Sequence, residues 1–104
     1  MALDDRQNST VIAANGTGEI TFAPGRGQTW TVQQATTDAD GIGGTALCNL
    51  YRSGVFVAAI FPTKGVAEGL PYVVVRPNQK FTARWTGGTP GVTATFAIIF
   101  DDGT

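Results

Sequence analysis

The sequence predicts an all-β protein, an antiparallel β-sandwich of about eight strands that is jelly-roll-like or immunoglobulin-like; an up-and-down barrel is the second choice. Short runs rich in β-branched and aromatic residues recur along the chain, and turn-forming residues separate them at intervals of about 8–12 residues. The chain also holds 14 glycines, which favour turns. No stretch with the period of an amphipathic helix exceeds two turns.

The expected strands are residues 9–14, 19–23, 28–35, 45–52, 55–61, 71–76, 79–85 and 92–100. The first ends in Asn15-Gly16, and because both residue types tolerate a positive φ, we expect a tight hairpin to the second. The second strand ends at Pro24-Gly25, where the chain is expected to turn. The third alternates, with Trp30 and Val32 on one face. The polar, glycine-rich residues 37–44 then predict a loop.

The fourth and fifth strands form the clearest predicted hairpin, because only Ser53-Gly54 separates them. In the fourth strand, Cys48 and Leu50 share one face. The fifth strand is apolar on both faces, which indicates either an inner strand or a contact with another subunit. Pro77-Asn78 joins the sixth strand to the seventh, and the last strand follows the glycine-rich loop 87–91.

A chain of 104 residues is long enough for one domain and too short for two. At this size about 65% of the extended chain's surface can be buried, which allows one modest core without disulfides. The strands place this domain at residues 9–100. Residues 1–8 (MALDDRQN) are polar and predict an N-terminal arm, and residues 101–104 predict a short polar tail.

The side chains that most enzymes use for acid–base and nucleophilic chemistry are scarce. The chain has no histidine, the side chain whose ordinary pKa lies closest to neutrality, so a serine or cysteine nucleophile would lack its usual base. Glu19 and Glu68 are the two glutamates, and nothing in the sequence pairs them across a cleft. We therefore expect a protein that is not an enzyme and that binds no cofactor.

The sequence also contains few residues suited to metal binding. The single cysteine, Cys48, cannot form an intramolecular disulfide, and it is expected to be buried as a small apolar group. Asp38 and Asp40 resemble the start of a calcium loop, but the twelfth position holds Asn49 instead of Glu. A looser Ca²⁺ site that adds an aspartate of the C-terminal tail stays open. Solvated loop carboxylates are the default, and no metal site is predicted.

The charge balance indicates which partners to expect. Seven Lys and Arg residues oppose eight Asp and Glu residues, without a basic cluster, so we expect no nucleic-acid partner. A lightly charged surface of net charge −1 repels other copies weakly, which favours a subunit of an assembly. The longest apolar run, residues 55–61, is far shorter than the roughly 20 residues that span a bilayer, so no membrane association is expected. Residues 1–8 lack the features of a signal peptide.

Trp30 and Trp85 admit two interpretations. As exposed rings they would form a platform for stacking a sugar, as in carbohydrate-binding modules. However, Trp85 shares one face of its strand with Phe81 and Ala83, which favours a place in the core. Six phenylalanines strengthen the case that aromatic rings fill volume here. Carbohydrate binding stays open as an alternative function.

Several short motifs resemble those of small β-rich virion proteins of tailed bacteriophages, especially phages of actinobacterial hosts. The motifs are Trp30-Thr31-Val32, residues 48–54 (CNLYRSG), residues 76–83 (RPNQKFTA) and residues 85–95 (WTGGTPGVTAT). The resemblance covers roughly residues 20–100, with Asn78 where the family usually has Gly. It implies a structural component of the head or tail, namely a capsid decoration protein, a head fibre base or a minor tail protein.

Decoration of the capsid exterior is the favoured expectation, because the chain is short and has no long fibre-like or coiled-coil segment. Many weakly bound copies would bridge neighbouring capsid subunits and stabilise the head by avidity. The implied partners are the major capsid protein and further copies of the chain, with a trimer as one option. The implied location is the virion, after synthesis in the host cytoplasm. A tail- or fibre-associated role is the alternative.

Two groups of residues are candidates for these contacts. The candidate inter-subunit surface, taken from the two most apolar strands, consists of Val55, Val57, Ala59, Phe61, Tyr72 and Val74. An inner core strand is the other interpretation of the same run. The candidate capsid-contacting residues of the N-terminal arm are Asp4, Asp5 and Arg6.

Overall fold

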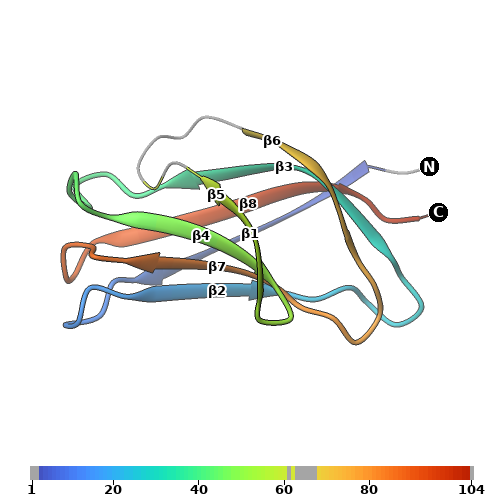
Figure 1. Ribbon diagram of the computed structural model, residues 1–104, viewed down its shortest axis with the longest axis horizontal. Coiled ribbons are helices and arrows are strands. Elements are labelled where there is room, and N and C mark those ends of the chain that lie inside the picture. Colours follow the sequence, from blue (N-terminus) through green and yellow to red (C-terminus); the bar gives the residue numbers. More distant parts are fainter. Residues whose placement is uncertain (1–2, 61, 63–67, 104) are drawn as a thin grey trace.

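A computed structural model describes residues 3–60, 62 and 68–103 of the chain. The strands are β1 (Leu3–Val11), β2 (Gly18–Phe22), β3 (Trp30–Asp38), β4 (Leu47–Arg52), β5 (Val55–Ile60), β6 (Glu68–Val75), β7 (Phe81–Thr86) and β8 (Thr93–Asp101). They form two four-stranded antiparallel sheets that pack face to face (Figure 1). The predicted all-β sandwich of eight strands is confirmed. The described residues contain no helix long and apolar enough to cross a membrane.

The strand order identifies the sandwich as a jelly roll. The first sheet has the order β1-β8-β3-β6 and the second the order β2-β7-β4-β5. Strand β1 therefore pairs with β8, β2 with β7, β3 with β6 and β4 with β5, all antiparallel. This nested pairing is that of one long hairpin rolled up so that successive strand pairs alternate between the sheets. The immunoglobulin-like arrangement and the up-and-down barrel are thereby excluded.

The core lies between the two sheets and is built by alternation along each strand. In β8 every second side chain is buried, and the same period holds in β7 and in the first part of β3. The largest fully buried side chains include Trp30, Leu50, Phe81, Trp85, Phe96, Ile98 and Phe100. Each stabilises the folded state by about 2–3 kcal/mol through removal of apolar surface from water. Cys48 is buried among them, as expected.

The N-terminal residues belong to the sandwich, which corrects the predicted arm. Strand β1 pairs with β8 over nine residues, from Leu3 opposite Asp101 to Val11 opposite Thr93. The backbone groups of β8 on this side need partners, and β1 supplies them despite its polar side chains. Residues 3–8 are therefore not an arm, and Asp101 belongs to β8 instead of a tail. Residues 1–2 lie outside the described part of the chain.

Of the two predicted hairpins, one is confirmed and one is wrong. Strands β4 and β5 are joined by Ser53 and Gly54, both with positive φ (48° and 85°), as a type I′ turn requires. The turn at Asn15-Gly16 instead carries the chain from the first sheet to the second, and the turn at Pro77-Asn78 does the same. In fact every connection except β4–β5 moves the chain between sheets. Asn78 has a φ of 72°, the left-handed conformation that Gly adopts more readily.

Three connections close one end of the sandwich by hydrogen bonds between backbone groups. Gly88 N donates to the Gly16 carbonyl, and Thr89 N donates to the Ile42 carbonyl. These residues come from connections β1–β2, β3–β4 and β7–β8, so the end is held by segments far apart in sequence. Ile12 and Ile42 are buried beneath them. The predicted glycine-rich loop is confirmed here, although β3 extends to Asp38 before it begins.

Candidate functional site

Strand β5 is an edge strand of the sandwich with exposed apolar side chains. It is the last strand of the second sheet, and within the described residues no strand pairs with its outer edge. Val55 is 62% exposed and Phe56 is 57% exposed. An exposed edge that combines unpaired backbone groups with apolar side chains is a surface onto which another chain can add. We refer to Val55, Phe56 and the outer edge of β5 as the β5 edge.

A β-bulge changes which side chains of β5 face outward. Leu50 pairs with Ala58, whereas the next residue, Tyr51, pairs with Phe56, so Val57 is the extra residue between them. Val57 and Ala58 both pack against the core. Of the candidate inter-subunit residues in this segment, Val55 is therefore exposed, whereas Val57 packs against the core.

The remaining members of the predicted inter-subunit surface have different outcomes. Ala59 is exposed on the outer face of the second sheet. Val74 is half-buried in β6, and its carbonyl accepts a hydrogen bond of 3.1 Å from Arg52 Nη1. Since Arg52 also pairs with Val55, these parts of β5 and β6 lie on the same flank of the sandwich. Phe61 lies outside the described residues, as does the side chain of Tyr72.

Phe56 is the exposed aromatic residue that the sequence-based prediction missed. Its ring meets the ring of Tyr51 edge-to-face, with centroids 6.1 Å apart and an interplanar angle of 90°. Both rings lie on the outer face of the second sheet. Strict alternation would place Phe56 on the same face as Ala58, but the bulge at Val57 places these two residues on opposite faces, and no local sequence signal announces it.

A shallow depression lies beside these rings on the outer face of the second sheet. Its volume is about 210 Å³, and it is lined by Glu19, Tyr51, Gly54, Thr82 and Arg84. The lining residues come from β2, β7, β4 and the β4–β5 turn. Cross-strand pairing brings them together, because Glu19 lies opposite Arg84 and Tyr51 lies opposite Thr82. We refer to these five residues as the sheet-two depression.

The two charged groups of the sheet-two depression are loosely paired. Arg84 Nε lies 3.7 Å from Glu19 Oε1, and both side chains are about half exposed. An ion pair of this length and exposure contributes little to stability. Both groups therefore keep hydrogen-bonding capacity that a bound molecule could use.

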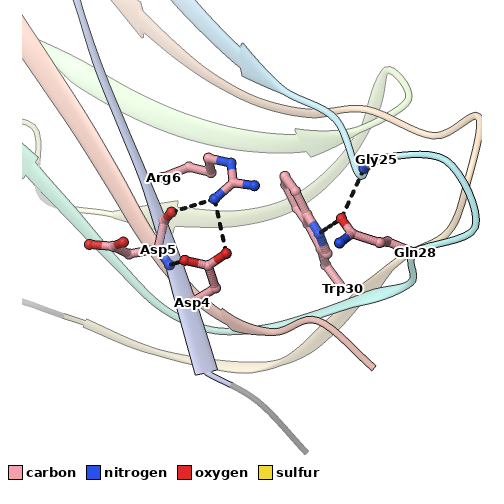
Figure 2. A network of polar contacts seen from close by, with 6 residues as sticks. All are labelled: Asp4, Asp5, Arg6, Gly25, Gln28 and Trp30. Atoms are coloured by element: carbon pink, nitrogen blue, oxygen red, sulfur yellow. Dashed lines mark hydrogen bonds and ion pairs between the residues drawn. The ribbon is translucent and has the colours of Figure 1, made fainter. Parts of the chain in front are cut away.

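The predicted capsid-contacting residues lie on β1, with Arg6 covering the edge of the core. Arg6 Nη1 lies 3.1 Å from Asp4 Oδ2 and donates a 2.8 Å hydrogen bond to the Asp5 carbonyl. The guanidinium lies over the rings of Trp30 and Phe100, which are stacked with centroids 4.1 Å apart. Figure 2 shows the Arg6 side chain directed toward Trp30. Arg6 therefore covers aromatic surface at this edge of the core.

The polar network continues on the far side of Trp30. The indole Nε1 donates to Gln28 Oε1 at 3.3 Å, and the same oxygen accepts a 3.1 Å hydrogen bond from Gly25 N (Figure 2). The β2–β3 connection is thereby tied to the core aromatic residue that follows it. The side chains of Asp4 and Arg6 thus interact with each other, and Arg6 also contacts this ring system, whereas Asp5 takes part through its backbone groups.

The candidate sugar-stacking platform of Trp30 and Trp85 is wrong. Trp30 is 1% exposed and Trp85 is 0% exposed, so neither ring face is available to a sugar. The alternative interpretation, that both rings fill the core, is confirmed. Trp85 faces inward from β7 together with Phe81 and Ala83, as the alternation predicted.

The described residues contain no cluster of three or more His, Cys, Asp and Glu side chains that could hold a metal ion. Asp38 ends β3 and Asp40 follows in the loop, both exposed. Asp101 lies at the opposite end of β8 from Thr95, the residue that pairs with Asp38. The looser Ca²⁺ arrangement is therefore not assembled by these carboxylates.

Comparisons with known proteins add little to this description. No family model matches the chain, and no curated protein matches it. Among solved structures, the chain is similar to dimeric latent PorU from Porphyromonas gingivalis, with a TM-score of 0.34 and 15% sequence identity. The matched region covers 98% of this chain and 13% of that protein, so the chain spans a small part of its length.

Proposed function

We propose that the chain is a non-enzymatic structural protein of a bacteriophage virion, and specifically a decoration protein that binds the outside of the capsid and stabilises the head. The observation that carries the proposal is the β5 edge, where Val55 and Phe56 are exposed beside backbone groups with which no described strand pairs. Such an edge gains both hydrogen bonds and apolar contact when another protein adds to it.

Three further features support this proposal. Jelly rolls serve as capsid domains in many viruses, although the fold alone does not determine function. The chain carries few charged residues and a net charge of −1, so neighbouring copies repel one another weakly. The motifs in residues 76–83 and 85–95 resemble those of small virion proteins, and they form the β6–β7 turn, β7 and the start of β8.

The proposed mechanism depends on copy number. The β5 edge is short, so each copy binds weakly, and a shell that offers many equivalent sites converts weak contacts into avid coating. The partners in this scheme are the major capsid protein and neighbouring copies of the chain, with a trimer suited to a three-fold site. The β5 edge is the preferred capsid contact, because it offers exposed apolar side chains, whereas Asp4 and Arg6 on β1 form an ion pair with each other.

The test adds purified protein to undecorated capsids of the encoding phage and images them by electron cryo-microscopy. The proposal expects ordered external density at saturating protein. Val55→Lys is expected to remove this density, because a charge at the β5 edge opposes strand addition. Val11→Lys is the matched control, since Val11 is similarly exposed (60%) at the edge strand of the other sheet.

The position of the density, and its loss in each variant, distinguish capsid decoration from a tail-associated role and the β5 edge from the first sheet. Absence of external density with the wild-type chain would end the decoration proposal, and density confined to the tail would support the tail-associated alternative. Density that survives Val55→Lys but is lost in Val11→Lys would move the contact to the first sheet. Light scattering of the purified chain measures whether copies associate before they reach the shell.

A further inference from the structure

The sheet-two depression combines an aromatic ring with groups that can donate and accept hydrogen bonds. The Tyr51 ring is half-buried and is held edge-to-face by Phe56, so its orientation is restrained from the side of β5. Thr82, directly opposite Tyr51 on β7, adds a hydroxyl group, and this hydroxyl lies 3.0 Å from that of Thr21. Opposite charges at Glu19 and Arg84 complete the lining.

The charges indicate which chemical class the depression suits. A carboxylate accepts hydrogen bonds and a guanidinium donates them, so the pair together matches adjacent hydroxyl groups that do both. Because the two charges are opposite and 3.7 Å apart, they favour neither an anion nor a cation. A neutral, polyhydroxylated ligand therefore fits better than a phosphate, a carboxylate or an amine.

The volume and lining of the sheet-two depression indicate more closely which neutral, polyhydroxylated ligand it fits. A volume of about 210 Å³ is smaller than the roughly 300–1,000 Å³ of sites for drug-sized molecules, which matches one small ring. A pyranose presents apolar C–H groups on one face and hydroxyl groups at its edge. The apolar body of Tyr51 suits the face, and Glu19, Thr82 and Arg84 suit the edge.

We propose that the sheet-two depression binds one neutral sugar residue of a glycan, with Tyr51 stacking on the ring and Glu19, Thr82 and Arg84 bonding its hydroxyl groups. This site is distinct from the buried Trp30 and Trp85. It also lies on the face of the sheet instead of the β5 edge, so its existence is independent of capsid decoration. Because a single ring offers few contact atoms, binding is expected to be weak, on the order of millimolar.

The experiment is an NMR titration of the ¹⁵N-labelled chain with glucose, galactose, mannose, N-acetylglucosamine and short oligomers of each. At least one sugar is expected to shift the amide signals of Gly54 and Thr82 in a saturable way. Glu19→Gln and Arg84→Gln are expected to weaken that binding about tenfold or more, and Tyr51→Leu to abolish it. Asp38→Asn, which neutralises a carboxylate at a similar depression on the first sheet, is the matched control and should bind as the wild type does.

Thermal unfolding of each variant tests whether the fold persists. Because Glu19 and Arg84 are exposed, their substitution is not expected to unfold the protein. The proposal is overturned if no sugar in the panel shifts Gly54 and Thr82, or if Glu19→Gln and Arg84→Gln bind as well as the wild type. Binding of glucuronic acid or glucosamine in preference to every neutral sugar would also contradict it. Since the titration contains no capsid, its result does not depend on the outcome of the decoration test.

Discussion

The guanidinium carbon of Arg6 lies 5.6 Å from the centre of the Trp30 ring and 5.5 Å from that of Phe100. A charged side chain thus covers two aromatic rings that are themselves buried. The methylene groups of arginine remove apolar surface from water, while the guanidinium interacts with the ring faces and stays partly solvated. The edge of the core is closed here by a residue that a strict hydrophobic pattern would place outside.

Replacing Arg6 is expected to destabilise the fold although the residue lies on an edge strand. Arg6→Ala should lower the free energy of unfolding by about 1–2 kcal/mol, because it removes the cation–π contact and uncovers Trp30. Urea denaturation followed by circular dichroism measures the change. Arg26→Ala, an exposed arginine in the β2–β3 connection, is the control for the lost charge. Equal effects in both variants would mean that the ring contact contributes nothing.

The two tryptophans are expected to respond differently to the same substitution. Trp30 Nε1 donates to Gln28, whereas Trp85 Nε1 is buried and has no acceptor among the described residues. Both changes to Phe remove similar volume, but Trp30→Phe also loses a hydrogen bond and Trp85→Phe removes an unsatisfied donor. Trp30→Phe should therefore cost about 1 kcal/mol more. Denaturation midpoints at equal m-values measure the difference, and a larger loss in Trp85→Phe would contradict this account.

Gly16 is expected to tolerate no side chain. Its φ is +82°, and a Cβ there would lie 3.0 Å from the Gly88 carbonyl oxygen, which is backbone and cannot swing away. Gly16→Ala should destabilise the fold by about 2 kcal/mol, from strain in the left-handed region and displacement of the facing loop. Gly44→Ala, at a position with open space around it, should change stability by less than about 0.5 kcal/mol. Thermal unfolding of the pair tests this contrast.

Cys48 is expected to resist thiol reagents in the folded protein. The side chain is buried in β4 between the sheets, and labelling requires access of the reagent to the sulfur. Its labelling rate should rise with urea and report on opening of the sandwich. Thr93→Cys in a Cys48→Ser background places a thiol on an exposed position of β8 and should react at once. Rapid labelling of the native wild type would show that this part of the core opens readily.

The strands could be predicted because their signals are local. Alternation placed Trp30, Val32, Phe81 and Trp85 correctly in the core, and the Ser53-Gly54 turn set the one true hairpin. Pairing between sheets could not be predicted in this way. A turn such as Asn15-Gly16 reverses the chain, but whether the next strand joins the same sheet depends on packing across the sandwich and on strands distant in sequence.

The polar residues of β1 also show that pairing between distant strands cannot be predicted from local sequence. Their polar side chains predicted a segment surrounded by solvent, yet the backbone of Asp4 and Arg6 pairs with β8. The two side chains form an ion pair, and Arg6 also contacts Trp30. At the candidate site, the bulge at Val57 places Phe56 and Ala58 on opposite faces, which leaves Phe56 exposed. The sheet-two depression depends on cross-strand register, which no single segment of the sequence contains.

The position of β8 has a consequence for how the protein is made. This strand comes last in the chain, but it lies in the interior of its sheet between β1 and β3 (Figure 1). During synthesis β1 leaves the ribosome long before its neighbour in the sheet exists, and pairing Leu3 with Asp101 then closes a loop that contains nearly the whole domain. The domain is expected to fold only after β8 has been synthesised, and to fold slowly, in the millisecond-to-second range typical of such non-local topologies. A chain that stops before Thr93 would keep β1 and β3 but lack the strand that joins them, so assembly of the first sheet waits until β8 itself has been synthesised.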